Sequence, residues 1–166
     1  MQRPHLATLL LLVGLLALLG RQASATTGMS FDDQPPPVLN VSTDSANPTV
    51  LNRLTVVCPA AGFLVATGTA TAFMRNVNSI TSTASEVFSI AREVKSDDAF
   101  RTVVVQTLGP NTFVDIPASL QRVDACHAGD TVTYFHVVHG SGGPAPIQVT
   151  TESRSRLIVE FFDQPL

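Results

Sequence analysis

The fold of this chain is decided by residues 63–74, which read FLVATGTATAFM. Odd-numbered positions in this stretch carry phenylalanine, valine and threonine, whereas even-numbered positions carry small or apolar residues. Since successive side chains of a strand point to opposite faces, the alternation predicts a long β-strand whose even-numbered face lies in the core. Alanine also favours helices, but a β-branched threonine at every second position favours a strand. We expect Phe63, Val65 and Phe73 to be partly covered on the other face.

Shorter segments with a period of two lie on both sides of this stretch, separated by turn sequences rich in glycine, proline, asparagine and aspartate. The segments expected to form strands are 54–58, 87–92, 101–108, 112–116, 120–126, 131–139, 147–151 and 156–162. Residues 82–93 are the nearest candidate for a helix, although their amphipathic pattern is weak. Eight to ten short strands in one domain predict an all-β fold, an antiparallel β-sandwich.

The first 25 residues have the layout of a secretory signal peptide. Arg3 precedes a mainly apolar run over residues 6–19, and small residues follow at 23–25. As a helix, the apolar run reaches only ~21 Å, less than a hydrocarbon core of ~30 Å. We therefore expect cleavage near Ala25, export, and a mature form without a membrane span.

The chain then divides into two further parts. Residues 26–50 contain three consecutive prolines and predict an extended leader or a first edge strand, and residues 51–166 form the sandwich domain. Asn40 begins a formal glycosylation sequon, Asn40-Val41-Ser42, which matters only in a host that glycosylates exported proteins.

Removal of the signal leaves eight basic and thirteen acidic residues, a formal charge of −5. This balance argues against nucleic acid or an anionic membrane as partner, because both require a basic patch. Charged residues make up 14% of the chain, below the usual ~25%, and threonine and serine stand in their place. Such a composition suits the exposed faces of strands.

Cys58 and Cys126 are the only cysteines in the sequence. In an exported protein an even pair is bonded more often than free, so we expect a structural disulfide. A metal pair or a redox site is the alternative, but the sequence has neither a CxxC spacing nor clustered histidines. A bridge that closes ~68 residues stabilises by about 4 kcal/mol in the chain-entropy model.

The histidines do not form a metal-binding pattern. His136 and His139 lie three residues apart, which on a regular strand places them on opposite faces. His127 stands beside a turn. We expect three independent histidines, each on the surface or half-buried, and no metal or cofactor.

No catalytic set is recognisable. The loop around Ser141 is superficially similar to the glycine-rich oxyanion loop of lipases, but the GxSxG nucleophile motif is missing. The carboxylates available for a glycosidase-type pair are Asp97, Asp98, Asp115, Asp124, Asp130 and Glu152, without a spacing that identifies a pair. Several of them lie in turns, where aspartate commonly accepts hydrogen bonds from backbone amides.

Two further features bear on contacts with other molecules. Phe161 and Phe162 are adjacent, so only one can face the core, and the other must be exposed, covered by a neighbouring strand or buried against another subunit. Surface loops at 96–100 and 140–145 are where we expect a ligand to bind.

Three short segments share features with a known group of domains. Residues 59–65, PAAGFLV, make a proline-glycine-aromatic entry into a long strand, residues 128–132, AGDTV, form a turn, and residues 157–162, LIVEFF, form a closing strand. Over residues 54–162 the chain resembles a secreted, bacterial-type jelly roll, distantly similar to the globular heads of complement and tumour-necrosis-factor-like proteins. The resemblance implies a trimer by analogy. The chain lacks their collagen stalk, tyrosine-rich core and receptor loop, so no functional residue is carried over.

The sequence therefore predicts an exported, non-catalytic binding or structural module whose ligand is an unidentified protein or carbohydrate. Two alternatives remain open: a small secreted hydrolase that uses a carboxylate pair, and a self-assembling envelope or matrix subunit, which would be a homo-oligomer.

Overall fold

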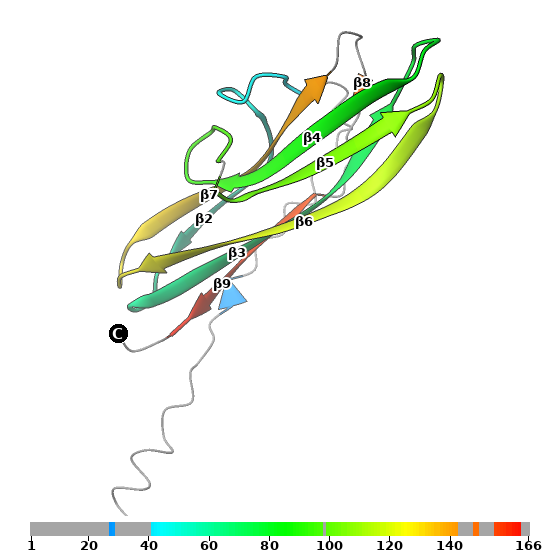
Figure 1. The fold of residues 1–166 in the computed structure, drawn as a ribbon. Coiled ribbons are helices and arrows are strands. Elements are labelled where there is room, and N and C mark those ends of the chain that lie inside the picture. Colours follow the sequence, from blue (N-terminus) through cyan, green and yellow to red (C-terminus); the bar gives the residue numbers. More distant parts are fainter. Residues whose placement is uncertain (1–26, 29–40, 98, 143–147, 150–154, 164–166) are drawn as a thin grey trace, which may run out of the picture.

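The computed structural model describes residues 27–28, 41–97, 99–142, 148–149 and 155–163. These residues form an all-β structure of two antiparallel sheets (Figure 1). One disulfide joins the two sheets. The predicted signal peptide and most of the predicted leader lie outside the described residues.

Sheet A has the strand order β1-β9-β3-β6, and β8 pairs with the end of β3. Its strands are β1 (Thr27–Gly28), β9 (Arg156–Phe162), β3 (Gly62–Arg75), β6 (Phe113–Cys126) and β8 (Gln148–Val149). Sheet B has the order β2-β7-β4-β5. Its strands are β2 (Thr49–Val57), β7 (Thr131–Gly142), β4 (Ser82–Ala91) and β5 (Arg101–Leu108).

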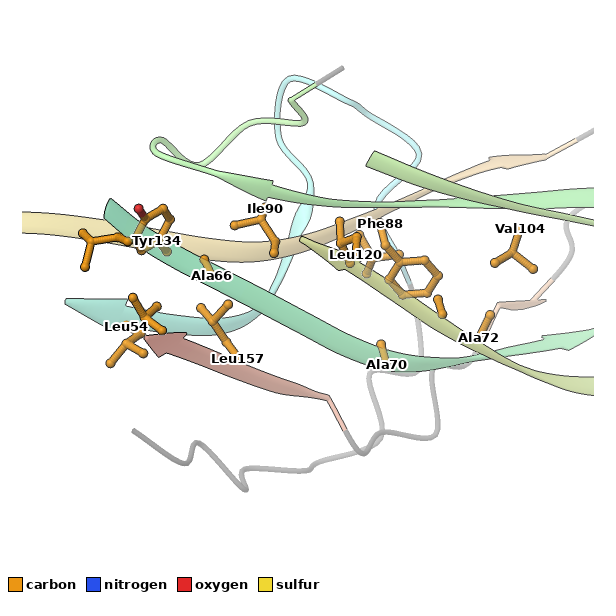
Figure 2. Packing of buried hydrophobic residues seen from close by; sticks show 14 of the residues in the cluster. Leu54, Ala66, Ala70, Ala72, Phe88, Ile90, Val104, Leu120, Tyr134 and Leu157 are labelled. Carbon is orange, nitrogen blue, oxygen red and sulfur yellow. The ribbon is translucent and has the colours of Figure 1, made fainter. Parts of the chain in front are cut away.

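The alternation in residues 63–74 is confirmed by β3. Even-numbered side chains of β3 are buried between the sheets, while Phe63, Val65 and Phe73 are half-buried on the outer face. Figure 2 shows the alanines of β3 facing the large side chains Phe88 and Tyr134 from sheet B. Small residues on one sheet thus leave room for aromatic residues on the other.

The disulfide between Cys58 and Cys126 is also confirmed. Cys58 follows the end of β2 and Cys126 ends β6, so the bridge joins sheet B to sheet A. Both cysteines are buried, and the turn before β7 is hydrogen-bonded to the backbone of Cys58. In that turn Gly129 donates its N–H to the carbonyl of Cys58 at 2.8 Å.

Residues 82–93, the nearest candidate for a helix, contain strand β4 over residues 82–91, which overlaps the strand predicted at 87–92 and begins five residues earlier. Strand alternation is hidden there since both faces of β4 are covered. The loop after β4 folds back over the outer face, where Asp97 donates its N–H to Ser89 Oγ at 3.2 Å. Ser96 donates its N–H to the carbonyl of Ser45 at 3.0 Å, which holds residues 41–48 beside the loop that covers the outer face of β4. Ser89 is therefore fully buried although it faces away from sheet A.

Residues 113–126 form one strand, whereas the sequence predicted two, over residues 112–116 and 120–126. Asn76 donates its N–H to the carbonyl of Thr112 at 2.9 Å, so by alternation the even-numbered residues of β6 bond to β3. The odd-numbered residues, Pro117 included, turn their backbone groups toward the free edge. Because a proline on an edge breaks no ladder hydrogen bond, the strand continues through it.

Candidate functional site

The outer face of sheet A gathers apolar side chains from three strands. Cross-strand register places Phe63 beside Phe162 and Val65 beside Val123, and Ile158 follows in the next row. These strands are far apart in the sequence, so the grouping depends on the fold. We call this group the apolar corner: Phe63, Val65, Val123, Ile158 and Phe162.

Two members of the apolar corner are open to solvent. The exposed fraction is 54% for Val123 and 43% for Phe162, and the other three residues are half-buried. As expected for adjacent residues of a strand, Phe161 faces the core while Phe162 faces outward. Exposed apolar side chains that lie side by side mark contact surfaces, whereas single exposed ones need no explanation.

The rest of this face is mainly polar and includes charged residues, with Arg156 opposite Thr69 and Asp115 opposite Phe73. Thr67, Thr69 and Thr71 line the centre of β3, and Gln121 donates from Nε2 to the Thr67 hydroxyl at 3.2 Å. Beyond these threonines, the rings of Phe73 and Phe113 have centroids 5.7 Å apart. The outer face therefore has apolar groups at both ends and a threonine strip between them.

A separate ion-pair cluster holds the loop that joins β4 to β5. The Arg122 guanidinium donates to Asp97 at 2.7 Å and to both oxygens of Asp124 at 2.7 and 3.1 Å. The Phe100 ring centroid lies 4.4 Å from the guanidinium carbon. Only 11% of the Arg122 side chain is exposed. This loop, which the sequence predicted as a ligand site, is thus held by its own protein contacts.

The cluster also sets the charge of Asp124. Burial raises the pKa of this carboxyl, but hydrogen bonding and the positive charges of Arg122 and Arg92 together outweigh burial and bring the pKa below its usual value. The Asp124 carboxylate is therefore an ion-pair partner at neutral pH and is unsuited to donate a proton.

Three polar side chains lie inside the sandwich. Glu86 is fully buried, and burial raises its pKa to about 8. Its carboxyl oxygens receive no hydrogen bond from the described residues. His136 is also fully buried, and burial lowers its pKa to about 4. Its Nδ1 lies 3.3 Å from Oδ1 of the buried Asn52 on the neighbouring strand.

The expectation that every histidine is on the surface or half-buried is wrong for His136. The His136 ring packs against Gly68 on sheet A. A Cβ atom at residue 68 would lie only 3.2 Å from the imidazole ring, so the glycine leaves room for the histidine. His139 is half-buried and belongs to the opposite face of β7, as strand alternation predicts. His127 is exposed in the turn, where its N–H donates to Asp130 Oδ2 at 2.9 Å.

The structure does not bring the remaining predicted residues to one place. Asp115 is exposed on β6, and Ser141 belongs to β7. Asn40, Asp98, Glu152 and residues 143–145 lie outside the described residues.

Comparison with known proteins gives no family assignment. No protein-family model matches the chain, and no curated protein matches it either. Among the described residues, no cluster of three or more histidine, cysteine or acidic side chains could hold a metal ion. Nor do those residues form any helix with the length and apolar character needed to cross a bilayer.

Sequence reasoning placed Phe63 and Val65 on the outer face and expected one of the adjacent phenylalanines at 161–162 to lie outside the core, but it missed their grouping into the apolar corner, and it missed the buried Glu86. A signal for Glu86 was present, because Glu86, Phe88 and Ile90 occupy alternate positions and therefore share one face of a strand. No comparable signal exists for the corner, since its members come from three strands whose register the sequence does not specify.

Proposed function

We propose that this protein is an exported, non-catalytic binding or structural module and that the outer face of sheet A is its contact surface. The observation that carries the proposal is the apolar corner, in which side chains from β3, β6 and β9 are in register and partly open to solvent. Burial of such a group against another protein removes apolar surface from water, which favours association.

A protein suits this face better than a carbohydrate does. The corner offers apolar side chains from three strands, and one carboxylate lies among them: Glu160, opposite Val65 and between Ile158 and Phe162 on the same face of β9. Apolar cores with a polar rim are typical of protein interfaces. The threonine strip would form that rim.

We further propose a jelly-roll topology for the two sheets. Successive strands from β1 to β4 alternate between sheet A and sheet B, and β9 lies between β1 and β3. Jelly rolls are double-sheet folds made of two Greek keys, and this strand order supports membership among them. Under this proposal the resemblance to complement and tumour-necrosis-factor-like heads implies a trimer, by analogy only.

Export is part of the same proposal. Disulfides persist in oxidising compartments, so the bridge between Cys58 and Cys126 supports a location outside the cytoplasm.

The hydrolase alternative has less support. Asp97 and Asp124 both contact Arg122, so two carboxylates do come together. A general acid needs a raised pKa, whereas the pKa of Asp124 is lowered. Glu86 has a raised pKa, but its carboxyl is shielded from any substrate between the sheets.

Light scattering over a concentration series tests the contact surface on residues 26–166. We expect the wild-type protein to associate and Val123→Glu to weaken that association at least tenfold, because a buried carboxylate opposes apolar contact and lies near Glu160. Val77→Glu is the matched control, since Val77 is exposed in the connection from β3 to β4. Equal masses for wild type, Val123→Glu and Val77→Glu would contradict the proposed surface.

A further inference from the structure

Strand β5 ends sheet B and presents a free edge. Ile90 on β4 donates its N–H to the carbonyl of Phe100 at 3.1 Å, so by alternation the even-numbered residues of β5 bond to β4. Odd-numbered residues therefore turn their backbone N–H and C=O groups away from the sheet. Within the described chain, no strand pairs with this edge at Val103 or Val105.

The β5 edge lacks the features that usually prevent strands from pairing. Residues 101–108, RTVVVQTL, contain no proline, glycine, lysine or acidic residue. Val103 and Val105 point outward, with exposed fractions of 48% and 60%. Apart from Arg101 at its start, the outward face of β5 carries no charge, and apolar edges without interior charge or proline are the ones that recruit another strand.

The free edges of β6 and β2 carry features that oppose strand pairing. Strand β6 carries Pro117 on its free edge, and its neighbour Ser119 has a carbonyl that accepts a hydrogen bond from Thr102 Oγ1 at 3.1 Å. Strand β2 has an irregular register between Val50 and Asn52. Edge prolines and bulges are common means of blocking strand addition. Strand β5 has neither a proline nor a register shift.

We propose that a second copy of this chain occupies the β5 edge and that the two β5 strands pair antiparallel about a two-fold axis. The outward backbone groups belong to odd-numbered residues, so the register must pair odd with odd. With Val104 on the axis, Val103 lies opposite Val105 of the second copy, and the whole strand is paired. The same register sets Arg101 against Thr107 of the second copy, which avoids opposing two arginines.

This pairing joins two four-stranded sheets B into one continuous sheet of eight strands. Its contacts involve the edge of sheet B, whereas the apolar corner lies on the outer face of sheet A. The β5 dimer is therefore independent of the function proposed above, and either can fail without the other.

Sedimentation of the Val123→Glu protein tests the dimer with the apolar corner disabled. We expect a dimer that Val105→Lys dissociates, with a dissociation constant raised at least tenfold, because two lysines would meet the valines of the other copy. Val57→Lys is the matched control: Val57 is 63% exposed on β2, at the opposite edge of the same sheet. The proposal would be overturned if the Val123→Glu protein were already a monomer, or if Val57→Lys dissociated the dimer as strongly as Val105→Lys does.

Cross-linking tests the register. Residues opposite each other in a bonded antiparallel pair have Cα atoms ~5.5 Å apart, which suits a disulfide. The double variant Arg101→Cys/Thr107→Cys should therefore form a covalent dimer under mild oxidation, seen on a non-reducing gel. Arg101→Cys alone should not, because the two copies of residue 101 lie six positions apart, about 20 Å. Equal cross-linking by the single variant would refute this register.

Discussion

Glu86 and His136 place two ionisable groups inside the sandwich, and both are neutral over a common range of pH. Burial raises the pKa of Glu86 from 4.5 to about 8, so its carboxyl keeps its proton well above the usual pH. Burial lowers the pKa of His136 from 6.5 to about 4, so its imidazole stays unprotonated well below the usual pH. Each shift reflects the cost of a charge in a dry interior.

The two groups make opposite contributions to stability. Between pH 4.5 and 8 the folded protein holds the Glu86 proton that the unfolded chain has lost, so stability falls as pH rises. Between pH 4 and 6.5 the unfolded chain binds a proton at His136 that the folded protein does not, so stability rises with pH. The two effects offset each other below pH 6.5, and only the Glu86 effect remains above it.

We therefore expect the free energy of unfolding to fall by about 2 kcal/mol from pH 6.5 to pH 8, at ~1.4 kcal/mol per pH unit for one proton. Glu86→Gln should remove this fall and reveal the rise caused by His136 at lower pH. Urea unfolding at pH 5, 6.5 and 8 measures both. A Glu86→Gln protein that loses as much stability as wild type above pH 6.5 would show that Glu86 is not the responsible group.

At the scale of elements, the close approach of β9 to the start of β3 depends on Gly62. A Cβ atom there would collide with the backbone carbonyl of Phe162 and lie 2.9 Å from the Phe161 ring. Gly62→Ala must push the two strands apart, and overpacking of this kind costs about 1–3 kcal/mol.

Thermal unfolding measures this effect. Gly109→Ala is the control, because its nearest neighbour would lie at an ordinary 3.8 Å. We expect a clear fall in Tm for Gly62→Ala and little change for Gly109→Ala. Similar Tm values for the two variants would mean that β9 can move away from Gly62 without cost.

The sequence predicted some elements better than others, for physical reasons. Residues 101–108 and 156–162 were predicted with their observed bounds, since each strand alternates between a covered and an open face. Strand β4 gave a weaker signal because loop residues cover its outer face and remove the alternation. The single strand over residues 113–126 was predicted as two, and the position of Pro117 on a free edge, which lets the strand continue, depends on sheet order and cannot be read locally. The apolar corner was unpredictable for the same reason.

At the scale of the whole molecule, the bridge between Cys58 and Cys126 is the covalent link between the two sheets. It closes a loop with a sequence separation of 68 residues, so it restricts the unfolded chain strongly. We expect the double variant Cys58→Ala/Cys126→Ala to be less stable by about 4 kcal/mol.

Reduction of the wild-type protein provides the comparison, because it should lower Tm by a similar amount while reduction of the double variant changes nothing. Mass measurement after alkylation of the unreduced, unfolded protein checks the bridge directly. Two alkylated thiols, or a double variant as stable as wild type, would refute its structural role.

The position of β9 between β1 and β3 constrains the order in which a newly made chain folds. Strand β3 is synthesised early, but its partner on one side is the last described strand, Arg156–Phe162. Until those residues emerge, the edge of β3 over residues 63–69 stays unpaired, and the apolar residues beneath it remain open. A chain released before β9 is synthesised would therefore expose an unpaired, aggregation-prone strand edge, which makes it a target for chaperones or proteases. A chain that stays extended until β9 has been synthesised can complete sheet A in one step.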